Sequence, residues 1–361
     1  MKCARSLSRQ SLLFRGLQSM PRERHTQRCP RMNARAPATH SPGRNRCDSE
    51  LVFTVAMRSI VDPVQYPALS RAIDLQLRVW PEHEAFLELR FKDANLGFAE
   101  RLAGLVERVA DSPEELAADY RWLCDRMNEE ELHFRRTNRY RLATFADADR
   151  EVYSNREFMR RYMNGVLLSH LWWDNHARVI ESYANRFLAG NRDAYSHLEI
   201  GPGHGLLLYL AATDPRCASA TGWDVSETSV AATRAMLIRL GCTRDVPLIR
   251  RDLMDAHQSD ARFDSIVISE VCEHLEDPRA ALVKLRGYLA SGGRLFVNIP
   301  INSPAPDHIY LLRTPEEAVD LVRSAGLEVV STTLCPMTGL SEQRARKLRA
   351  TISCIVVGTI V

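Results

Sequence analysis

Two carboxylates and an imidazole stand close together in one short stretch of the chain. Residues 269–278 read Ser-Glu-Val-Cys-Glu-His-Leu-Glu-Asp-Pro, which places Glu270, Glu273 and His274 at positions i, i+3 and i+4. In one turn of helix this spacing puts all three side chains on the same face. Groups that converge in this way are suited to hold a divalent cation.

A glycine-rich turn precedes this stretch in the sequence. Residues 197–205 read His-Leu-Glu-Ile-Gly-Pro-Gly-His-Gly, and the apolar run 206–212 follows them. The order predicts a short strand, a glycine turn and a helix. Gly201, Gly203 and Gly205 let the backbone turn tightly and approach a ligand, because a β-carbon would block the approach. The helix after the turn points backbone N–H groups at that ligand, so we expect a nucleotide-like molecule there.

Two further predicted strands end in acidic residues. Residues 221–225 read Thr-Gly-Trp-Asp-Val, and Asp224 lies about 20 residues beyond the turn, where a carboxylate accepts both ribose hydroxyls. The strand at 247–251 ends at Asp252, which is placed to hold an adenine amino group with Leu253 beside the ring.

Taken together, these segments resemble class I S-adenosylmethionine-dependent methyltransferases. The matching segments are 199–205, Asp224, Asp252 with Leu253, and 263–270, which read Phe-Asp-Ser-Ile-Val-Ile-Ser-Glu. A dehydrogenase fits less well, because Glu-x-Gly-x-Gly-x-Gly differs from Gly-x-Gly-x-x-Gly. The resemblance covers about residues 195–361 and implies S-adenosylmethionine as the cofactor. The residues that it implies as cofactor-binding are Glu199, Gly201, Gly203, Gly205, Asp224, Asp252, Leu253 and Ser269.

The stretch at 269–274 is similar to the Ser-Glu-Val-x-Glu-His motif of the ubiquinone-pathway O-methyltransferases, which act on dihydroxy aromatic rings. In that family the two Glu and the His bind Mg²⁺. The stretch also resembles the Glu-x-x-Glu-His of small-RNA 2′-O-methyltransferases, which add a later His, and His308 stands where that ligand would fall. The resemblance therefore implies Mg²⁺ or another divalent cation held by Glu270, Glu273, His274 and His308.

A second interpretation of the same residues stays open. Glu-His-Leu-x-Asp-Pro also occurs in metal-independent methyltransferases, where the Glu and His hydrogen-bond locally. In that case His274 or His308 is the candidate catalytic base.

The pattern from residue 197 onward predicts an α/β fold. Strands and helices alternate, which implies a parallel sheet with right-handed crossovers. With the resemblance, we expect a seven-stranded, mostly parallel, Rossmann-like methyltransferase sheet with helices on both faces, and a hairpin-like last pair of strands around an insertion at 336–350. The predicted strands are 197–200, 219–224, 247–251, 263–268, 293–299, 327–334 and 351–359, and the predicted helices are 205–213, 227–240, 277–290 and 315–325.

The part of the chain before this fold is predicted to be helical. Apolar residues recur at helical spacing, and Asp-Ser-Pro-Glu at 111–114 predicts a helix start. We divide the chain into a basic extension at 1–56, a helical N-terminal region at 57–150, cap helices at 151–196 and the methyltransferase domain at 197–361. Trp172, Trp173 and His176 lie in an aromatic stripe of the cap, which fits either plain core or a substrate pocket.

Charge is distributed unevenly along the chain. Residues 1–60 hold 12 Lys and Arg and 3 Asp and Glu, a net of +9, which leaves 48 − 12 = 36 basic and 45 − 3 = 42 acidic residues, a net of −6, for the rest. We expect residues 1–56 to be a disordered extension or sequence upstream of a start at Met57. An organelle transit segment and a nucleic-acid-binding tail are the alternatives. The acidic body does not favour a nucleic-acid partner.

Composition sets the remaining limits. The nine Cys show no C-x-x-C spacing, which indicates reduced thiols and a cytoplasmic protein, and no apolar run is long enough to span a membrane. We expect a methyltransferase that acts on a small molecule, at a hydroxyl oxygen. The alternatives are an RNA 2′-O-methyltransferase, a non-catalytic binding protein with this fold, and an enzyme that uses the cofactor without methyl transfer. The oligomeric state stays open.

Overall fold

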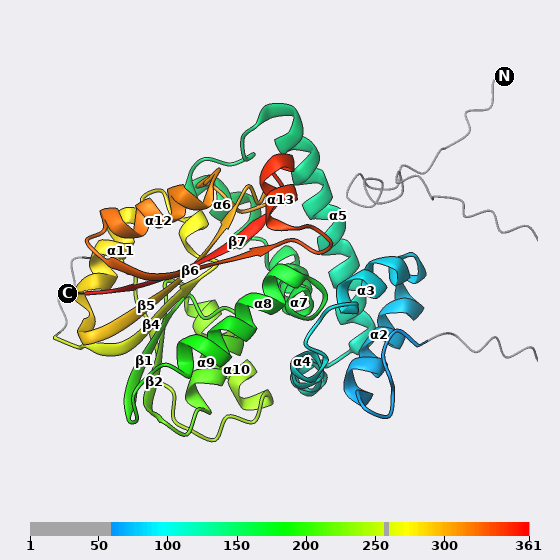
Figure 1. The fold of residues 1–361 in the computed structure, drawn as a ribbon, viewed down its shortest axis with the longest axis horizontal. Helices are drawn as coiled ribbons and strands as arrows, with labels where there is room; N and C mark the ends of the chain where they lie inside the picture. The colour runs from blue at the N-terminus through cyan, green and yellow to red at the C-terminus, as the bar shows by residue number, and fades with distance from the viewer. Residues whose placement is uncertain (1–58, 256–259, 361) are drawn as a thin grey trace, which may run out of the picture. The chain divides into compact units, whose positions relative to one another are not determined.

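The computed structural model describes residues 59–255 and 260–360. Ser59–Val361 form one compact unit, shown in Figure 1. The predictions for the extension at 1–56 and for a start at Met57 lie outside the described residues. Among the helices that the structure describes, none is both long and apolar enough to cross a bilayer.

The first half of the unit is helical. Helix α5 shows why the sequence folds in this way: the Ser112 hydroxyl accepts from the backbone N–H of Glu115 (3.3 Å), proline occupies the first turn, and the helix ends at Asn138 in the left-handed conformation. The helical segments are α2 (Pro67–Val79), η1 (Pro81–His83), α3 (Glu84–Phe91), α4 (Leu96–Val109), α5 (Pro113–Thr137), α6 (Phe145–Ala148), η2 (Asp149–Tyr153), α7 (Arg156–Trp172), α8 (Asp174–Ser182) and η3 (Tyr183–Leu188).

The second half contains a seven-stranded sheet with the order β3-β2-β1-β4-β5-β7-β6. The pairs β2–β3, β1–β2, β1–β4 and β4–β5 are parallel, whereas β7 runs antiparallel to both β5 and β6. The prediction of a mostly parallel, seven-stranded sheet is confirmed. The strands are β1 (Tyr195–Ile200), β2 (Cys217–Asp224), β3 (Leu248–Arg250), β4 (Phe263–Ser269), β5 (Leu289–Ile301), β6 (Glu328–Pro336) and β7 (Ile352–Thr359).

Helices cover both faces of the sheet. Figure 1 shows α8, α9 and α10 on one side and α11 and α12 on the other. Successive residues of a strand accordingly pack into different hydrophobic cores. Val267 belongs to the core that includes α9, and Ile266 and Ile268 belong to the core that includes α11. The helices of this half are α9 (Leu206–Ala212), α10 (Glu227–Arg239), η4 (Cys272–His274), α11 (Pro278–Gly287), α12 (Pro315–Ser324) and α13 (Glu342–Leu348), the last within the insertion between β6 and β7.

Strand β5 begins earlier than its sequence pattern predicts. The strand starts at Leu289 instead of residue 293, because the register between β4 and β5 shifts after Phe263. A β-carbon on Gly293 would lie 2.9 Å from the carbonyl oxygen of Phe263, so the glycine permits a close backbone approach here. The sequence pattern places Gly292 and Gly293 at the end of a helix, whereas in the structure they belong to an irregular part of strand β5.

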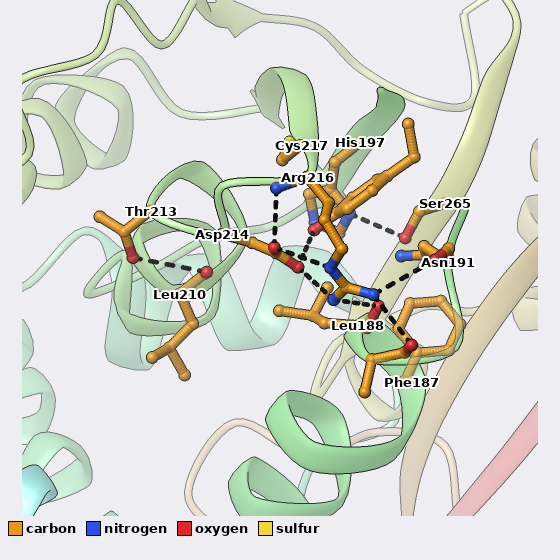
Figure 2. Close-up of polar contacts among 12 residues, drawn as sticks. Phe187, Leu188, Asn191, His197, Leu210, Thr213, Asp214, Arg216, Cys217 and Ser265 are labelled. Atoms are coloured by element: carbon orange, nitrogen blue, oxygen red, sulfur yellow. Dashed lines mark hydrogen bonds and ion pairs between the residues drawn. The ribbon is translucent and has the colours of Figure 1, made fainter. Parts of the chain in front are cut away.

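The amino end of the sheet is tied to the preceding helices by Arg216 (Figure 2). Its guanidinium donates to the carboxylate of Asp214 at 2.7 Å, to the carbonyl of Leu188 at 3.0 Å and to that of Asn191 at 3.3 Å. These bonds join the end of η3 to the turn between α9 and β2. The opposite, carboxyl edge of the parallel strands therefore remains the place for a ligand site.

Candidate active site

The carboxyl ends of the central strands bring the predicted site residues together. Strand β1 lies between β2 and β4, and Ile200 pairs with Trp223 on one side and with Ile268 on the other. Asp224 and Ser269 follow directly on these two partners. The glycine turn after β1 consequently lies between the end of β2, which carries Asp224, and the end of β4, which carries Ser269.

The glycine turn has the backbone conformation that its sequence predicts. Gly201, Gly203 and Gly205 have φ values of 64°, 51° and 72°, in the left-handed region that favours glycine. The Thr233 hydroxyl of α10 donates to the carbonyl of Gly203 at 2.7 Å and fixes the turn. A β-carbon on Gly201 would lie 2.8 Å from the side chain of Val271, which shows how closely this turn approaches the end of β4.

Glu199 is a buried carboxyl just before the turn. Its side chain is buried, Oε2 has no hydrogen-bond partner among the described residues, and burial raises its pKa well above the usual range. A buried acceptor without a donor is costly in free energy. An ammonium group on a ligand would satisfy it, and S-adenosylmethionine carries such a group.

Asp224 and the residues after β3 line the same edge. The Asp224 Oδ1 accepts from the backbone N–H of Ser226 at 2.8 Å, and burial raises the pKa of this carboxyl. Asp224 pairs with Arg250, so Asp252 lies two residues past its partner. Asp252 is exposed and accepts from the N–H of Met254 at 2.7 Å, whereas Leu253 is half-buried.

Glu273, His274 and His308 form a tight cluster. One ligand atom from each lies within 4.8 Å of the others. The Nε2 atoms of His274 and His308 are each 3.8 Å from Oε1 of Glu273. The Glu273 side chain is fully buried, its carboxyl lies within hydrogen-bonding reach of the Glu270 carboxyl, and its oxygens accept from no other described group.

The partners of the two imidazoles decide which nitrogen atoms are free. The His308 Nδ1 lies 2.6 Å from the carbonyl oxygen of Ser303, and the His274 Nδ1 lies 3.1 Å from that of Asp307. Carbonyl oxygens only accept, so we assign the proton to Nδ1 in both rings. Both Nε2 lone pairs then face Glu273. Two such nitrogens and one carboxylate, each ring held by a second partner, are a donor set that fits a divalent cation.

The predicted helical turn is wrong for Glu270. Its φ is 53°, in the left-handed region, and η4 begins only at Cys272. The backbone N–H of Glu270 donates to the carbonyl of Asn298 at 3.0 Å, which keeps the chain alongside β5 before the helical turn starts. The Asn298 amide donates to Oε1 of Glu270 at 2.7 Å and to the Ser269 hydroxyl at 3.0 Å.

The side chain of Glu270 nevertheless lies beside the cluster. Burial raises the pKa of both Glu270 and Glu273, and the charge of Glu270 raises that of Glu273 further. Burial also lowers the pKa of His308 to about 4, with a smaller contribution from His274. The predicted ligand residues therefore share one buried region, with Glu270 held by Asn298 instead of by a helix.

Sequence reasoning missed the groups that hold His274. Asp307 is buried and accepts from the hydroxyl of Tyr162 at 2.8 Å and from that of Tyr153 at 3.3 Å. The Tyr153 hydroxyl also lies 3.0 Å from Nδ1 of His274. These tyrosines come from η2 and α7, more than 100 residues earlier. The only local sequence signal that Asp307 lies at the site was its position directly before His308.

Comparison with known proteins adds to this description. Residues 198–295 match a family described as a methyltransferase domain. A ubiquinone biosynthesis O-methyltransferase from Pseudomonas aeruginosa is 29% identical over 148 residues, which cover 38% of this chain and 61% of the relative. One from Nitrosomonas europaea is 24% identical over 203 residues, which cover 47% of this chain and 84% of that protein. The chain thus spans less than two thirds of the Pseudomonas relative.

Solved structures are similar to this chain only in part. The mitomycin 7-O-methyltransferase MmcR shares 17% identity and a TM-score of 0.45, over 71% of this chain and 73% of its own. The cyclase SpnF shares 18% identity and a TM-score of 0.42, over 51% and 81%.

Proposed function

We propose that this protein is an S-adenosylmethionine-dependent methyltransferase that acts on a hydroxyl oxygen of a small molecule. The observation that carries the proposal is the cluster of Glu273, His274 and His308, buried at the carboxyl edge of the sheet beside a left-handed glycine turn. The methyltransferase match over 198–295 includes the turn and the first two cluster residues.

Cofactor binding follows from the groups along this edge. Asp224 is the partner for the ribose hydroxyls, and Glu199 is the partner for the amino group. Gly201, Gly203 and Gly205 leave the backbone accessible to the ligand. Asp252 and Leu253 complete the adenine side, and Ser269 lies at the end of β4.

A divalent cation fits the cluster, because the buried Glu273 carboxyl has only the Glu270 carboxyl within hydrogen-bonding reach, and the Nε2 atoms of two imidazoles face it. The residues that would hold the cation are Glu273, His274 and His308, with Glu270 beside them. A bound cation would supply Lewis acidity that lowers the pKa of an acceptor hydroxyl. Asp307 and Ser303 orient the two imidazoles, and Asn298 orients Glu270.

The helical region before β1 acts in this proposal as a cap on the acceptor pocket. Tyr153 and Tyr162 support it, because both reach Asp307 beside the cluster. A small acceptor agrees with the net charge of −6 in residues 61–361 better than a nucleic acid does.

The decisive experiment is incubation of the full-length protein with a metabolite extract and S-adenosylmethionine that carries a ¹³C-methyl group. Mass spectrometry should reveal a labelled product that grows with time. The Asp224→Ala variant is the matched control and should give none above background. Calorimetry that shows no S-adenosylmethionine binding to the unaltered protein would refute the proposal.

A further inference from the structure

Two aromatic residues at the corner between α7 and α8 have an arrangement that the proposed cofactor and cation sites do not explain. Trp173 separates the two helices and is half-buried, in contrast to Trp172, which is fully packed in the core. The Trp173 indole N–H donates to the Tyr120 hydroxyl at 2.8 Å, which fixes the plane of the ring. The ring of His176 stands edge-on to it, with centroids 4.9 Å apart.

Hydrogen bonds leave one nitrogen of His176 free. The Ser169 hydroxyl donates to the carbonyl of Val166 at 2.6 Å, so its oxygen accepts from Nδ1 of His176 at 2.8 Å. This assignment puts the proton on Nδ1 and a lone pair on Nε2. No group in 59–255 or 260–360 hydrogen-bonds to that Nε2.

His176 lies close to the glycine turn. Its ring centroid is 5.4 Å from that of His170, whose Nε2 is 2.6 Å from Nε2 of His204 in the glycine turn. Burial lowers the pKa of His176 to about 3, with smaller contributions from His204 and His308. The imidazole is therefore neutral at neutral pH.

The groups around this corner have a common chemical preference. The imidazoles of His170, His176 and His204 are held neutral, because burial lowers the pKa of each. An imidazole lone pair in low-dielectric surroundings favours a ligand that donates a hydrogen bond and disfavours an anion. The half-buried indole of Trp173 provides apolar area for a flat molecule.

We propose that Trp173 and His176 form the subsite that holds the methyl acceptor. An uncharged, flat acceptor packs against the indole and donates an O–H or N–H hydrogen bond to Nε2 of His176. This inference rests on the proposed function only in identifying the ligand as the methyl acceptor. The binding that it predicts does not depend on methyl transfer. His176 is a binding residue in this scheme and takes no proton.

The test uses saturation-transfer NMR with full-length protein and two small probes, resorcinol and benzoate, in the presence of a chelator. Resorcinol offers two hydroxyl donors in positions that cannot chelate one cation, and benzoate offers only an anion. His176→Phe keeps a ring but removes the acceptor, whereas His176→Gln keeps an acceptor oxygen. Arg178→Gln alters an exposed residue of the same helix and is the control. Thermal unfolding of each variant verifies that it folds.

We expect the unaltered protein to bind resorcinol more strongly than benzoate. His176→Phe should weaken resorcinol about three- to tenfold, the effect of one lost neutral hydrogen bond, and His176→Gln and Arg178→Gln should stay close to the unaltered protein. Equal resorcinol binding in His176→Phe, a preference for benzoate, or no resorcinol signal from the unaltered protein would overturn the subsite. Calorimetry with S-adenosylmethionine separates the two proposals, because resorcinol binding that depends on His176 without cofactor binding would sink only the proposed function.

Discussion

Asp224 is the side chain on which we expect cofactor affinity to depend most clearly. Asp224→Ala removes charge-assisted hydrogen bonds to two ribose hydroxyls, so we expect S-adenosylmethionine binding to weaken by roughly 1.5–3 kcal/mol. Isothermal titration calorimetry measures this change, with the exposed Asp245→Ala as control. Unchanged affinity would remove Asp224 from the site.

Gly203 leads to a second prediction at the same scale. Its φ of 51° and the Met163 methyl only 3.4 Å from a hypothetical β-carbon leave little room for a branched side chain. Gly203→Val should abolish cofactor binding, because it strains the turn and fills the space of the ligand. Measurable binding by this variant in calorimetry would show that the ligand avoids the turn.

The Glu-His cluster predicts a dependence on metal. Chelator should suppress turnover while leaving cofactor binding nearly intact, and Glu270→Gln should mimic the chelator because it removes a charge and keeps the shape. Loss of His308 should have the same effect less severely. Full activity in chelator, with no metal detected in the purified protein, would favour the alternative in which these residues only form local hydrogen bonds. His274 would then become the candidate base.

Asp307 should act through His274. Asp307→Asn weakens the acceptor for two tyrosine hydroxyls and loosens the orientation of the imidazole, so cation affinity should fall about 10–100-fold. Calorimetric titration with Mn²⁺ checks this fall, with Tyr209→Phe on α9 as control. Equal affinity in Asp307→Asn would leave the residue with a purely structural role.

The sequence predicts some of these residues far better than others. Gly201, Asp224 and Glu273 belong to local motifs whose spacing reflects strand ends, so their neighbourhood could be predicted. Asp307 and Tyr162 meet only because the fold brings α7 next to the loop after β5, and no spacing along the chain records that contact. Glu270 was placed on a helix because the pattern is helical, but its bonds to Asn298 on β5 override the local preference.

At the scale of elements, a glycine permits the close packing of α5 against α7. A β-carbon on Gly165 of α7 would lie 2.6 Å from Cβ of Leu123 and 3.2 Å from the carbonyl oxygen of Asp119. Gly165→Ala should lower the free energy of unfolding by about 1–3 kcal/mol, because the helices must separate. Denaturant unfolding measures the change.

Gly104 provides the matched comparison. It lies inside α4, and nothing stands within 4 Å of a hypothetical β-carbon. Gly104→Ala should therefore raise the free energy of unfolding by roughly 0.5–1 kcal/mol, since alanine costs less entropy in a helix. If both variants were stabilised, the close contact between α5 and α7 would not exist.

Element boundaries show where sequence patterns lose accuracy. Helix α10 begins after Ser226, whose hydroxyl accepts from the N–H of Ser229 at 3.2 Å, and the pattern located that start correctly. Strand β5 was predicted to begin four residues too late, because Gly292 and Gly293 indicate a helix end, whereas the structure places them in the strand. A glycine in the sequence indicates an unusual backbone conformation, but it does not distinguish the end of a helix from an irregularity in a strand.

At the scale of the whole molecule, the chain divides by charge and by contacts in the same region. Residues 1–60 carry a net charge of +9 and the rest −6, and the described contacts belong to the compact unit Ser59–Val361. A protein that begins at Met57 should consequently unfold at the same temperature as the full chain, within about 2 °C, and bind S-adenosylmethionine with equal affinity. Calorimetry should measure the unfolding temperature of both proteins at low salt and at about 0.5 M salt. Salt screens charges, so the comparison tests whether the basic segment interacts with the acidic body. Loss of folded protein on truncation would show that the segment stabilises the fold, and a salt-dependent difference in unfolding temperature would indicate an electrostatic contact between the two.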